Sequence, residues 1–177
     1  MNAPLAPNES ARLQVLRRRE ILDTTPEPHF DDLTRLAAQI CGTPVATISF
    51  LDGQRQWFKP KVGMTTTETP VEFAFCAHGI LQAGVFIIPD ARVDERFAGH
   101  PLVTGDSKVC FYAGVPLVTA DGQALGMLSV TDQIPRELSQ EQMKALQALG
   151  RQVMAQLELR LSLAEMPATP CPAAGSC

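Results

Sequence analysis

Apolar residues recur with two different periods along the chain, and the changes of period divide it into helices and strands. Spacings of three to four residues predict helices over about 9–22, 28–41 and 139–165. Alternation predicts two hairpins, over about 45–62 and 109–131, each turning at an Asp-Gly pair. A short helix at about 72–81 and an apolar strand at 85–88 lie between them. Residues 63–72 and 89–108 have no period and are expected to be loops, and a loop as long as the second is often functional.

This order of elements predicts an α+β domain. Two hairpins imply a largely antiparallel sheet, and the helices from both chain ends are expected to cover one of its faces. Within the first hairpin, Ala46, Ile48 and Phe50 should point to one face of the sheet, and Thr47 and Ser49 to the other. We expect the folded domain to span 9–165. Residues 1–8 are expected to form a flexible tail, and residues 166–177, rich in Pro, Ala, Gly and Ser, a disordered one.

Composition narrows the classes of partner. The chain has a net charge of −4, whereas nucleic-acid-binding domains are usually basic, with lysine and arginine clustered on one surface. No apolar run reaches the ~18 residues of a membrane span, and no signal peptide precedes the first helix. We therefore expect a cytoplasmic protein with no nucleic-acid or membrane partner. The five cysteines are irregularly spaced, with no Cys-x-x-Cys pair, so neither a disulfide framework nor a zinc site is expected.

Six segments, in this order, resemble GAF domains of the kind that precede the output domains of bacterial sensor kinases and diguanylate cyclases. They are ILDTTPEPHFDDLTRLAAQICGTPVATISFLD, RQWFK, FCAH, PDARVDERFAGHPLV, FYAGVPL and GQALGMLSVTD. The resemblance implies a fold related to PAS and profilin-like domains, with five or six antiparallel strands and the terminal helices on one face. A small-molecule pocket would lie on the other face, roofed by residues 63–82 and 89–108.

The resemblance also implies a function in bacterial signal transduction. We expect a sensory module that binds an unidentified small molecule and, having neither kinase nor cyclase motifs, acts on a separate signalling protein rather than as an enzyme. A ligand-free interaction scaffold is an alternative. A homodimer through the terminal helices is also implied, and the apolar stripe of the last helix would form its interface. The stripe residues are Leu146, Leu149, Val153, Leu157 and Leu161. The same stripe would equally suit a helix that only covers its own sheet.

Candidate ligand-binding residues come from the roof segments and the strand that follows them. A thiol and an imidazole two residues apart, Cys76 and His78, have the chemistry to bind a ligand, although on a helix they point in different directions. The acidic and basic residues after Asp90 would either recognise a polar ligand or pair with one another. Aromatic residues nearby would line the pocket or belong to the core. The candidate set is Phe75, Cys76, His78, Asp90, Phe97, Phe111 and Tyr112.

No cofactor, metal or catalytic residue is expected. GAF domains that attach a bilin typically have a histidine directly after the cysteine, whereas here Ala77 follows Cys76. The acidic pair nearest to a cyclic-nucleotide signature lacks its Asn and Lys. His29, His78 and His100 are the candidate haem ligands, but His29 lies in a polar run and His100 in the long loop, and neither is expected in the apolar box that haem needs. Free methionine-(R)-sulfoxide reductases are GAF proteins of similar size, so a thiol-dependent reductase using Cys76, with Cys110 as its resolving partner, is the enzymatic alternative.

Overall fold

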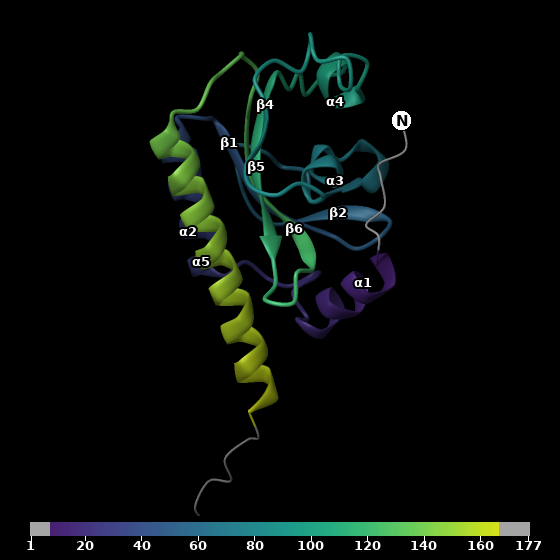
Figure 1. Cartoon of the computed structure of the whole chain (residues 1–177), viewed down its shortest axis with the longest axis vertical. Coiled ribbons are helices and arrows are strands. Elements are labelled where there is room, and N and C mark those ends of the chain that lie inside the picture. Colours follow the sequence, from purple (N-terminus) through teal and green to yellow (C-terminus); the bar gives the residue numbers. More distant parts are fainter. Residues whose placement is uncertain (1–7, 167–177) are drawn as a thin grey trace, which may run out of the picture.

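A computed structural model describes residues 8–166, and its centre is a six-stranded antiparallel sheet (Figure 1). The predicted tails, 1–8 and 166–177, lie outside the described residues except for Asn8 and Met166. The strand order is β3-β2-β1-β6-β5-β4, so the two predicted hairpins meet at β1 and β6. The strands are β1 (Val45–Leu51), β2 (Arg55–Val62), β3 (Glu68–Pro70), β4 (Phe86–Ile88), β5 (Phe111–Val118) and β6 (Ala124–Asp132).

Five helices accompany the sheet in the described part of the chain. Two match the prediction closely because their ends carry strong signals: Pro28 opens one and left-handed Gly42 closes it, while Ser139 and Gln142 form the expected capping box at the start of the last helix. The first helix ends four residues earlier than predicted, since the chain turns at Glu20, which has a positive φ. The helices are α1 (Glu9–Arg18), α2 (Pro28–Cys41), α3 (Phe75–Gly79), α4 (Pro101–Thr104) and α5 (Gln140–Glu165).

The predicted helix at 72–81 is split in two. A 3₁₀ turn, η1 (Val71–Phe73), precedes α3, and the extended backbone of Ala74 separates them. Residues 63–72, expected as a loop, contain the three-residue edge strand β3, and α4 interrupts the long 89–108 segment. These short elements shape the face of the sheet that carries the site.

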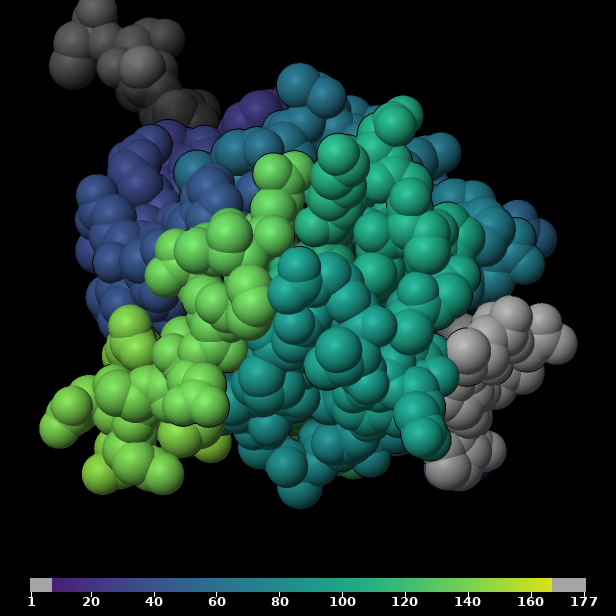
Figure 2. All heavy atoms as spheres, turned by 90° about the horizontal axis from the view of Figure 1, so that it is seen from above, coloured from purple at the N-terminus to yellow at the C-terminus, as the bar shows by residue number. Residues whose placement is uncertain are grey.

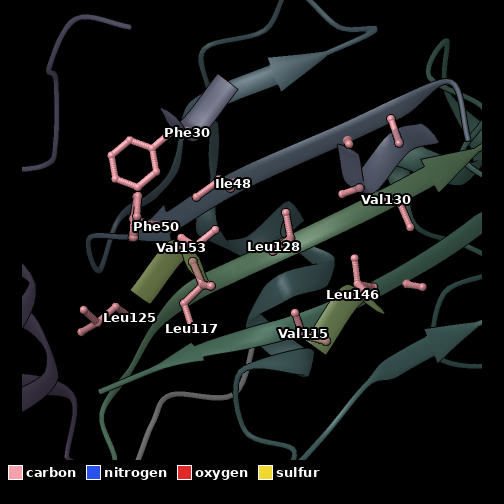
Figure 3. Packing of buried hydrophobic residues seen from close by; sticks show 14 of the residues in the cluster. Phe30, Ile48, Phe50, Val115, Leu117, Leu125, Leu128, Val130, Leu146 and Val153 are labelled. Atoms are coloured by element: carbon pink, nitrogen blue, oxygen red, sulfur yellow. The ribbon is translucent and has the colours of Figure 1, made fainter. Parts of the chain in front are cut away.

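The sheet separates two layers (Figure 1). The long helices α2 and α5 cover one face, whereas α3, α4 and the 89–108 segment lie on the other, and α1 lies beside the β1–β2 turn. Ala46, Ile48 and Phe50 belong to the core under α2 and α5, as the alternation in β1 predicts. Figure 3 shows the side chains of this core meeting between sheet and helices. The helix-side core includes Phe30, Ile48, Phe50, Val115, Leu117, Leu125, Leu128, Val130, Leu146 and Val153.

Most of the predicted dimer stripe belongs to this core. Leu146, Val153 and Leu157 are 0% exposed between α5 and the sheet, so their assignment to a dimer interface is wrong. Leu149 is half-buried against the same core, and Leu161 is half-exposed. An amphipathic helix buries its strongest apolar face first, and here that face is needed to cover β5 and β6. Any surface that α5 offers to a partner must lie on its other sides.

The segment between β6 and α5 ties the two layers together at one end of the molecule. Figure 2, which looks down on that end, shows it between the region of α2 and β1 and the segment after β4. Two hydrogen bonds fix it: the Arg136 backbone N–H donates to the Pro89 carbonyl at 3.2 Å, and Gln142 Nε2 donates to the Ile40 carbonyl at 3.0 Å. The start of α5 is thereby held to both sides of the sheet.

Candidate functional site

A cavity of about 510 Å³ lies on the face of the sheet opposite α2 and α5. This volume is within the range of small-molecule sites. Its floor consists of side chains that alternate with the helix-side core along β1, β2, β5 and β6, and its walls come from the loop after β2 and from the region around α4. The lining residues are Pro44, Val45, Thr47, Gln56, Phe58, Gly63, Met64, Thr65, Thr66, Thr69, Phe75, Leu102, Ser107, Val109, Tyr112, Ser129, Thr131, Asp132 and Gln133.

The floor is rich in buried hydroxyl and amide groups. The Thr47 and Ser129 hydroxyls are 2.9 Å apart across β1 and β6, and Gln56 Nε2 donates to the Ser49 hydroxyl at 2.9 Å. The Tyr112 hydroxyl has a weak acceptor, Met127 Sδ at 3.6 Å. Burial raises the pKa of Tyr112 well above its ordinary value, so its phenol keeps its proton. The site therefore presents neutral hydrogen-bonding groups that are already held in place by one another.

The structure brings two of the seven candidate ligand-binding residues, Phe75 and Tyr112, to the cavity wall. Phe111 is 0% exposed in the core under α2 and α5, so its assignment to the pocket is wrong. It precedes Tyr112 in β5, and neighbouring side chains in a strand point to opposite faces. Cys76 and Phe97, also 0% exposed, lie in the second core between the sheet and the roof, without lining the cavity.

Four charged residues of the 89–108 segment form two ion pairs with one another. Arg92 Nη2 lies 2.7 Å from Asp90 Oδ2, and Arg96 Nη2 lies 2.6 Å from Asp94 Oδ2. The same aspartates accept the backbone N–H groups of the paired arginines, so each pair closes its own turn. The Arg96 guanidinium also lies 5.1 Å from the Phe97 ring centroid. Asp90 therefore stabilises the turn that contains it and does not line the cavity.

Sequence reasoning missed most of the cavity's polar residues. Threonine, serine and glutamine are ordinary in a strand, and nothing in their own spacing marks them. The signal was present in the alternation of the first hairpin, which places Thr47 opposite the apolar face of β1. The missed polar residues are Thr47, Gln56, Thr65, Thr66, Thr69, Ser107, Ser129, Thr131, Asp132 and Gln133.

Comparison with known families settles what kind of domain surrounds this cavity. The GAF domain model matches residues 25–157, which span α2 to most of α5. The chain belongs to the GAF domain family. The predicted fold class, an α+β domain with an antiparallel sheet of five or six strands, is confirmed: the sheet has six strands, and the structural neighbours share the fold.

Relatives of this GAF domain have different roles. It is 38% identical over 155 residues to a cyclic di-GMP phosphodiesterase of Pseudomonas aeruginosa, covering 87% of this chain and 26% of that protein. The GAF domain of an Acinetobacter phosphoenolpyruvate-protein phosphotransferase superposes with a TM-score of 0.61 at 18% identity, covering 88% of this chain and 98% of the other. A free methionine-R-sulfoxide reductase from Neisseria meningitidis has a TM-score of 0.61 at 13% identity, with 93% and 98% covered. The two structures share the fold of this chain.

The cysteines of the GAF domain are poorly placed for thiol chemistry in the cavity. Burial raises the pKa of the Cys76 thiol to about 12, and none of the cysteines in residues 8–166 lines the cavity. Burial and a hydrogen bond to Asp90 also raise the pKa of Cys110, whose Sγ lies 3.2 Å from Asp90 Oδ1. A nucleophilic cysteine needs an accessible thiolate, and these groups are protonated at neutral pH. Cys171 and Cys177 lie outside the described residues.

Two further absences hold for residues 8–166. No three or more His, Cys, Asp and Glu side chains gather there in an arrangement that would hold a metal ion. No helix in the same range combines the length and apolar character needed to cross a bilayer.

Two histidines lie in the aromatic cluster behind the cavity. The His100 ring is 4.7 Å from the Phe75 ring centroid, and the His78 ring is 5.1 Å from that of Phe97. Burial lowers the pKa of both, with the charge of Arg96 adding to the effect on His78 and that of His78 adding to the effect on His100. Nδ1 of His100 also accepts the Leu102 N–H at 3.2 Å, which is possible only while that nitrogen is unprotonated.

These histidines predict a loss of stability in mild acid. Because their folded pKa values lie below the unfolded value of about 6.5, the unfolded chain takes up protons first as the pH falls. The free energy of unfolding that the two histidines contribute is therefore fully present above about pH 6.5, and it is lost as the pH falls from there to their folded pKa values. Urea unfolding of the wild type and of a His78→Gln, His100→Gln double variant, at pH 7.5 and 5.5, measures the effect. The wild type should lose more stability between the two pH values than the variant, and equal losses would contradict the assignment.

Proposed function

We propose that this GAF domain is a small-molecule-responsive regulatory module of bacterial signal transduction, acting in the cytoplasm on a separate signalling protein. The observation that carries the proposal is the cavity, which joins a neutral hydrogen-bonding floor to aromatic and aliphatic walls on the face of the sheet away from α2 and α5. A concave site with a few convergent polar groups is the usual form of a small-molecule site. The phosphodiesterase relative, of which the matching region is 26%, supports a signalling setting.

The chain also offers a physical connection between the cavity and α5. Gln56 and Phe58 of β2 line the cavity, and Lys59, the next residue, points to the other side. Its Nζ lies 2.6 Å from Glu27 Oε2, and Glu27 Oε1 accepts a hydrogen bond from Arg160 Nη1 at 2.6 Å. A ligand that moves β2 would act on α5 through this one carboxylate. The arrangement supports a role in which α5 carries the response.

We propose that the domain forms a homodimer through the far part of α5. Leu159 and Leu163 of α5 are 53% and 61% exposed, and their four-residue spacing places them on one side of the helix, as in a coiled-coil seam. Met166, the residue after the helix, is 63% exposed. In Figure 1 this part of α5 extends beyond the sheet. Unlike the buried stripe that the sequence suggested, these side chains are available to a second copy.

The dimer is tested by making this seam acidic. Leu159→Glu with Leu163→Glu should convert a dimer to a monomer in analytical ultracentrifugation, because four carboxylates would meet along one seam. The thermal midpoint of the monomeric variant should stay close to that of the wild type diluted until it is monomeric, since neither leucine belongs to the core. A matched control, Leu36→Glu on the exposed side of α2, should remain dimeric. A wild-type protein that sediments as a monomer at all concentrations would refute the proposal.

Ligand binding is tested by native mass spectrometry of freshly purified protein, with an absorption spectrum alongside. We expect a small extra mass on the wild type that is absent from Thr131→Trp, because Thr131 lines the cavity and an indole there would fill it. The control Val118→Trp adds the same ring at an exposed position of β5 that does not line the cavity. Extra mass that persists in Thr131→Trp would place the bound molecule elsewhere.

The enzymatic alternative receives less support. The reductase neighbour shares the fold, but Cys76 is buried and protonated, and no cysteine of residues 8–166 lines the cavity, so a sulfoxide bound there would meet no thiol nucleophile from these residues. Turnover of free methionine sulfoxide that is lost in Cys76→Ser would favour the reductase and contradict a purely regulatory role. A ligand-free scaffold would be favoured by a cavity that retains nothing.

A further inference from the structure

The cavity contains almost no charge. Among its nineteen lining residues, Asp132 is the one with a carboxyl group, and none is Arg, Lys or His. The Asp132 side chain is 8% exposed, and it is already engaged: Oδ2 lies 2.5 Å from Arg136 Nε, and Oδ1 accepts the Gln133 N–H at 2.6 Å. The one negative charge of the wall is thus neutralised by a neighbouring cation. A cationic ligand would find no free carboxylate among these residues.

The lining also supplies little positive potential for an anion. Two helices start at or next to lining residues, α3 at Phe75 and α4 at Pro101, but they have only five and four residues. The first N–H donor of α4, that of Leu102, is already bonded to His100 Nδ1. Lys61, close to the rim, donates to the carbonyls of Thr65 and Thr66 at 2.6 and 2.8 Å and does not line the cavity. A phosphate or carboxylate brought into the cavity would lose its water without gaining a counter-charge, which is strongly unfavourable.

The cavity offers instead a neutral set of contacts. Tyr112 is 3% exposed, and its hydroxyl, which lies 3.6 Å from the weakly accepting Met127 Sδ and next to the Ser129 side chain, can donate a stronger hydrogen bond to a ligand. The Thr47–Ser129 hydroxyl pair and the Gln56 amide can each accept or donate further bonds. Phe58 and Phe75 add aromatic rings to the lining. These groups suit a ligand with an apolar body and a hydrogen-bonding carbonyl, hydroxyl or amide.

We propose that the cavity binds an uncharged polar molecule of this kind and excludes phosphorylated and carboxylated ones, including the nucleotide second messengers. The inference rests on the proposed ligand-binding function and makes it more specific. On this proposal, the ligand of the cavity differs from the substrate of the phosphodiesterase relative. That substrate, cyclic di-GMP, carries two phosphodiesters and so does not indicate which molecule the cavity binds.

The test uses the full chain and a bacterial metabolite extract divided by ion-exchange resins into neutral, anionic and cationic pools. Each pool is incubated with wild type, with Thr131→Trp and with Val118→Trp; after desalting, retained molecules are identified by mass spectrometry. Cyclic di-GMP and cyclic GMP are added to a separate sample as defined anionic probes. We expect retention from the neutral pool, roughly tenfold higher on wild type and Val118→Trp than on Thr131→Trp, and no retention of either nucleotide. If Thr131→Trp does not fold, Thr66→Trp at the exposed rim replaces it.

The outcomes separate this inference from the proposed function. A cavity-dependent molecule from the anionic or cationic pool, or retention of a cyclic nucleotide, would overturn the inference while leaving the regulatory function intact. Anion retention that disappears in Lys61→Met would identify Lys61 as the counter-charge and overturn it in the same way. No difference between wild type and Thr131→Trp in any pool would overturn both.

Discussion

Replacing Gly126 with alanine is expected to cost more than about 4 kcal/mol of stability, enough to prevent folding of most single domains. Gly126 of β6 pairs with Phe50 of β1 at the centre of the sheet. A Cβ built on it would lie 1.8 Å from the Ser49 carbonyl oxygen and 2.9 Å from the Phe50 Cα. These are backbone atoms of a central strand, so no side chain can move aside, and the two hairpins would have to separate.

Chemical denaturation followed by circular dichroism measures this effect. The matched control is Gly99→Ala, because a Cβ at Gly99 meets nothing within 4 Å. The control should unfold at nearly the same denaturant concentration as the wild type, while Gly126→Ala should be unfolded or aggregated without denaturant. A Gly126→Ala protein with a wild-type midpoint would show that β1 and β6 are farther apart than described.

Removing the Lys59 ammonium should cost about 3 kcal/mol, the amount typical of breaking one side of a buried ion pair. The Lys59 side chain is 1% exposed. Its Nζ donates to the Thr24 hydroxyl and the Thr25 carbonyl, at 2.6 and 2.5 Å, and contacts Glu27 as an ion pair. Burial alone would raise the pKa of Glu27, but its hydrogen bond and charge contact with Lys59 prevail and lower it. Lys59→Met therefore leaves a half-buried carboxylate and two polar groups with fewer partners.

The comparison is with Lys144→Met, which removes an exposed ammonium from α5 and should change stability by less than about 0.5 kcal/mol. The Glu27 pKa adds a second readout. Because folding lowers the pKa of Glu27, its carboxylate stabilises the folded state above the unfolded pKa, and this stabilisation is lost as the pH falls through the folded pKa. The difference in stability between wild type and Lys59→Met should therefore shrink in acid. A difference that is constant from pH 7 to pH 3 would mean that Lys59 acts through packing alone.

Local signals explain why the large elements were predictable. Proline at the start of α2, left-handed Gly42 at its end and the Ser139 capping box fix helix ends through interactions that are close in sequence. The alternation in β1 sets which side chains face the helices. By contrast, β3 has three residues with no apolar pattern, and it exists because β2 offers a partner edge. Its formation depends on a contact that the sequence does not display.

The site was harder to predict than the fold, for a related reason. The residues that attract attention in a sequence, such as Cys76, His78 and Asp90, have strong intrinsic chemistry, yet here they are buried or paired with neighbours. The cavity is built from ordinary residues, such as Thr47 and Ser129, that are 82 positions apart and meet only through the register of β1 and β6. Such neutral side chains do not stand out in the sequence, and they form a cavity only because the sheet places them next to one another.

The way that α5 leaves the domain has a consequence for fusion proteins. Each residue turns an α-helix by about 100°, so the direction that a fused domain faces depends on how many residues follow the seam of Leu159 and Leu163. In a chimera whose second domain is joined to Glu165 by a helical linker, lengthening that linker by seven residues restores the original azimuth to within about 20°, whereas lengthening it by five rotates the fused domain by about 140°. A chimera whose output depends on helix orientation should therefore keep its response in steps of seven and lose or invert it between them. The length of the linker then sets the orientation of the fused domain about the axis of α5, independently of the ligand in the cavity.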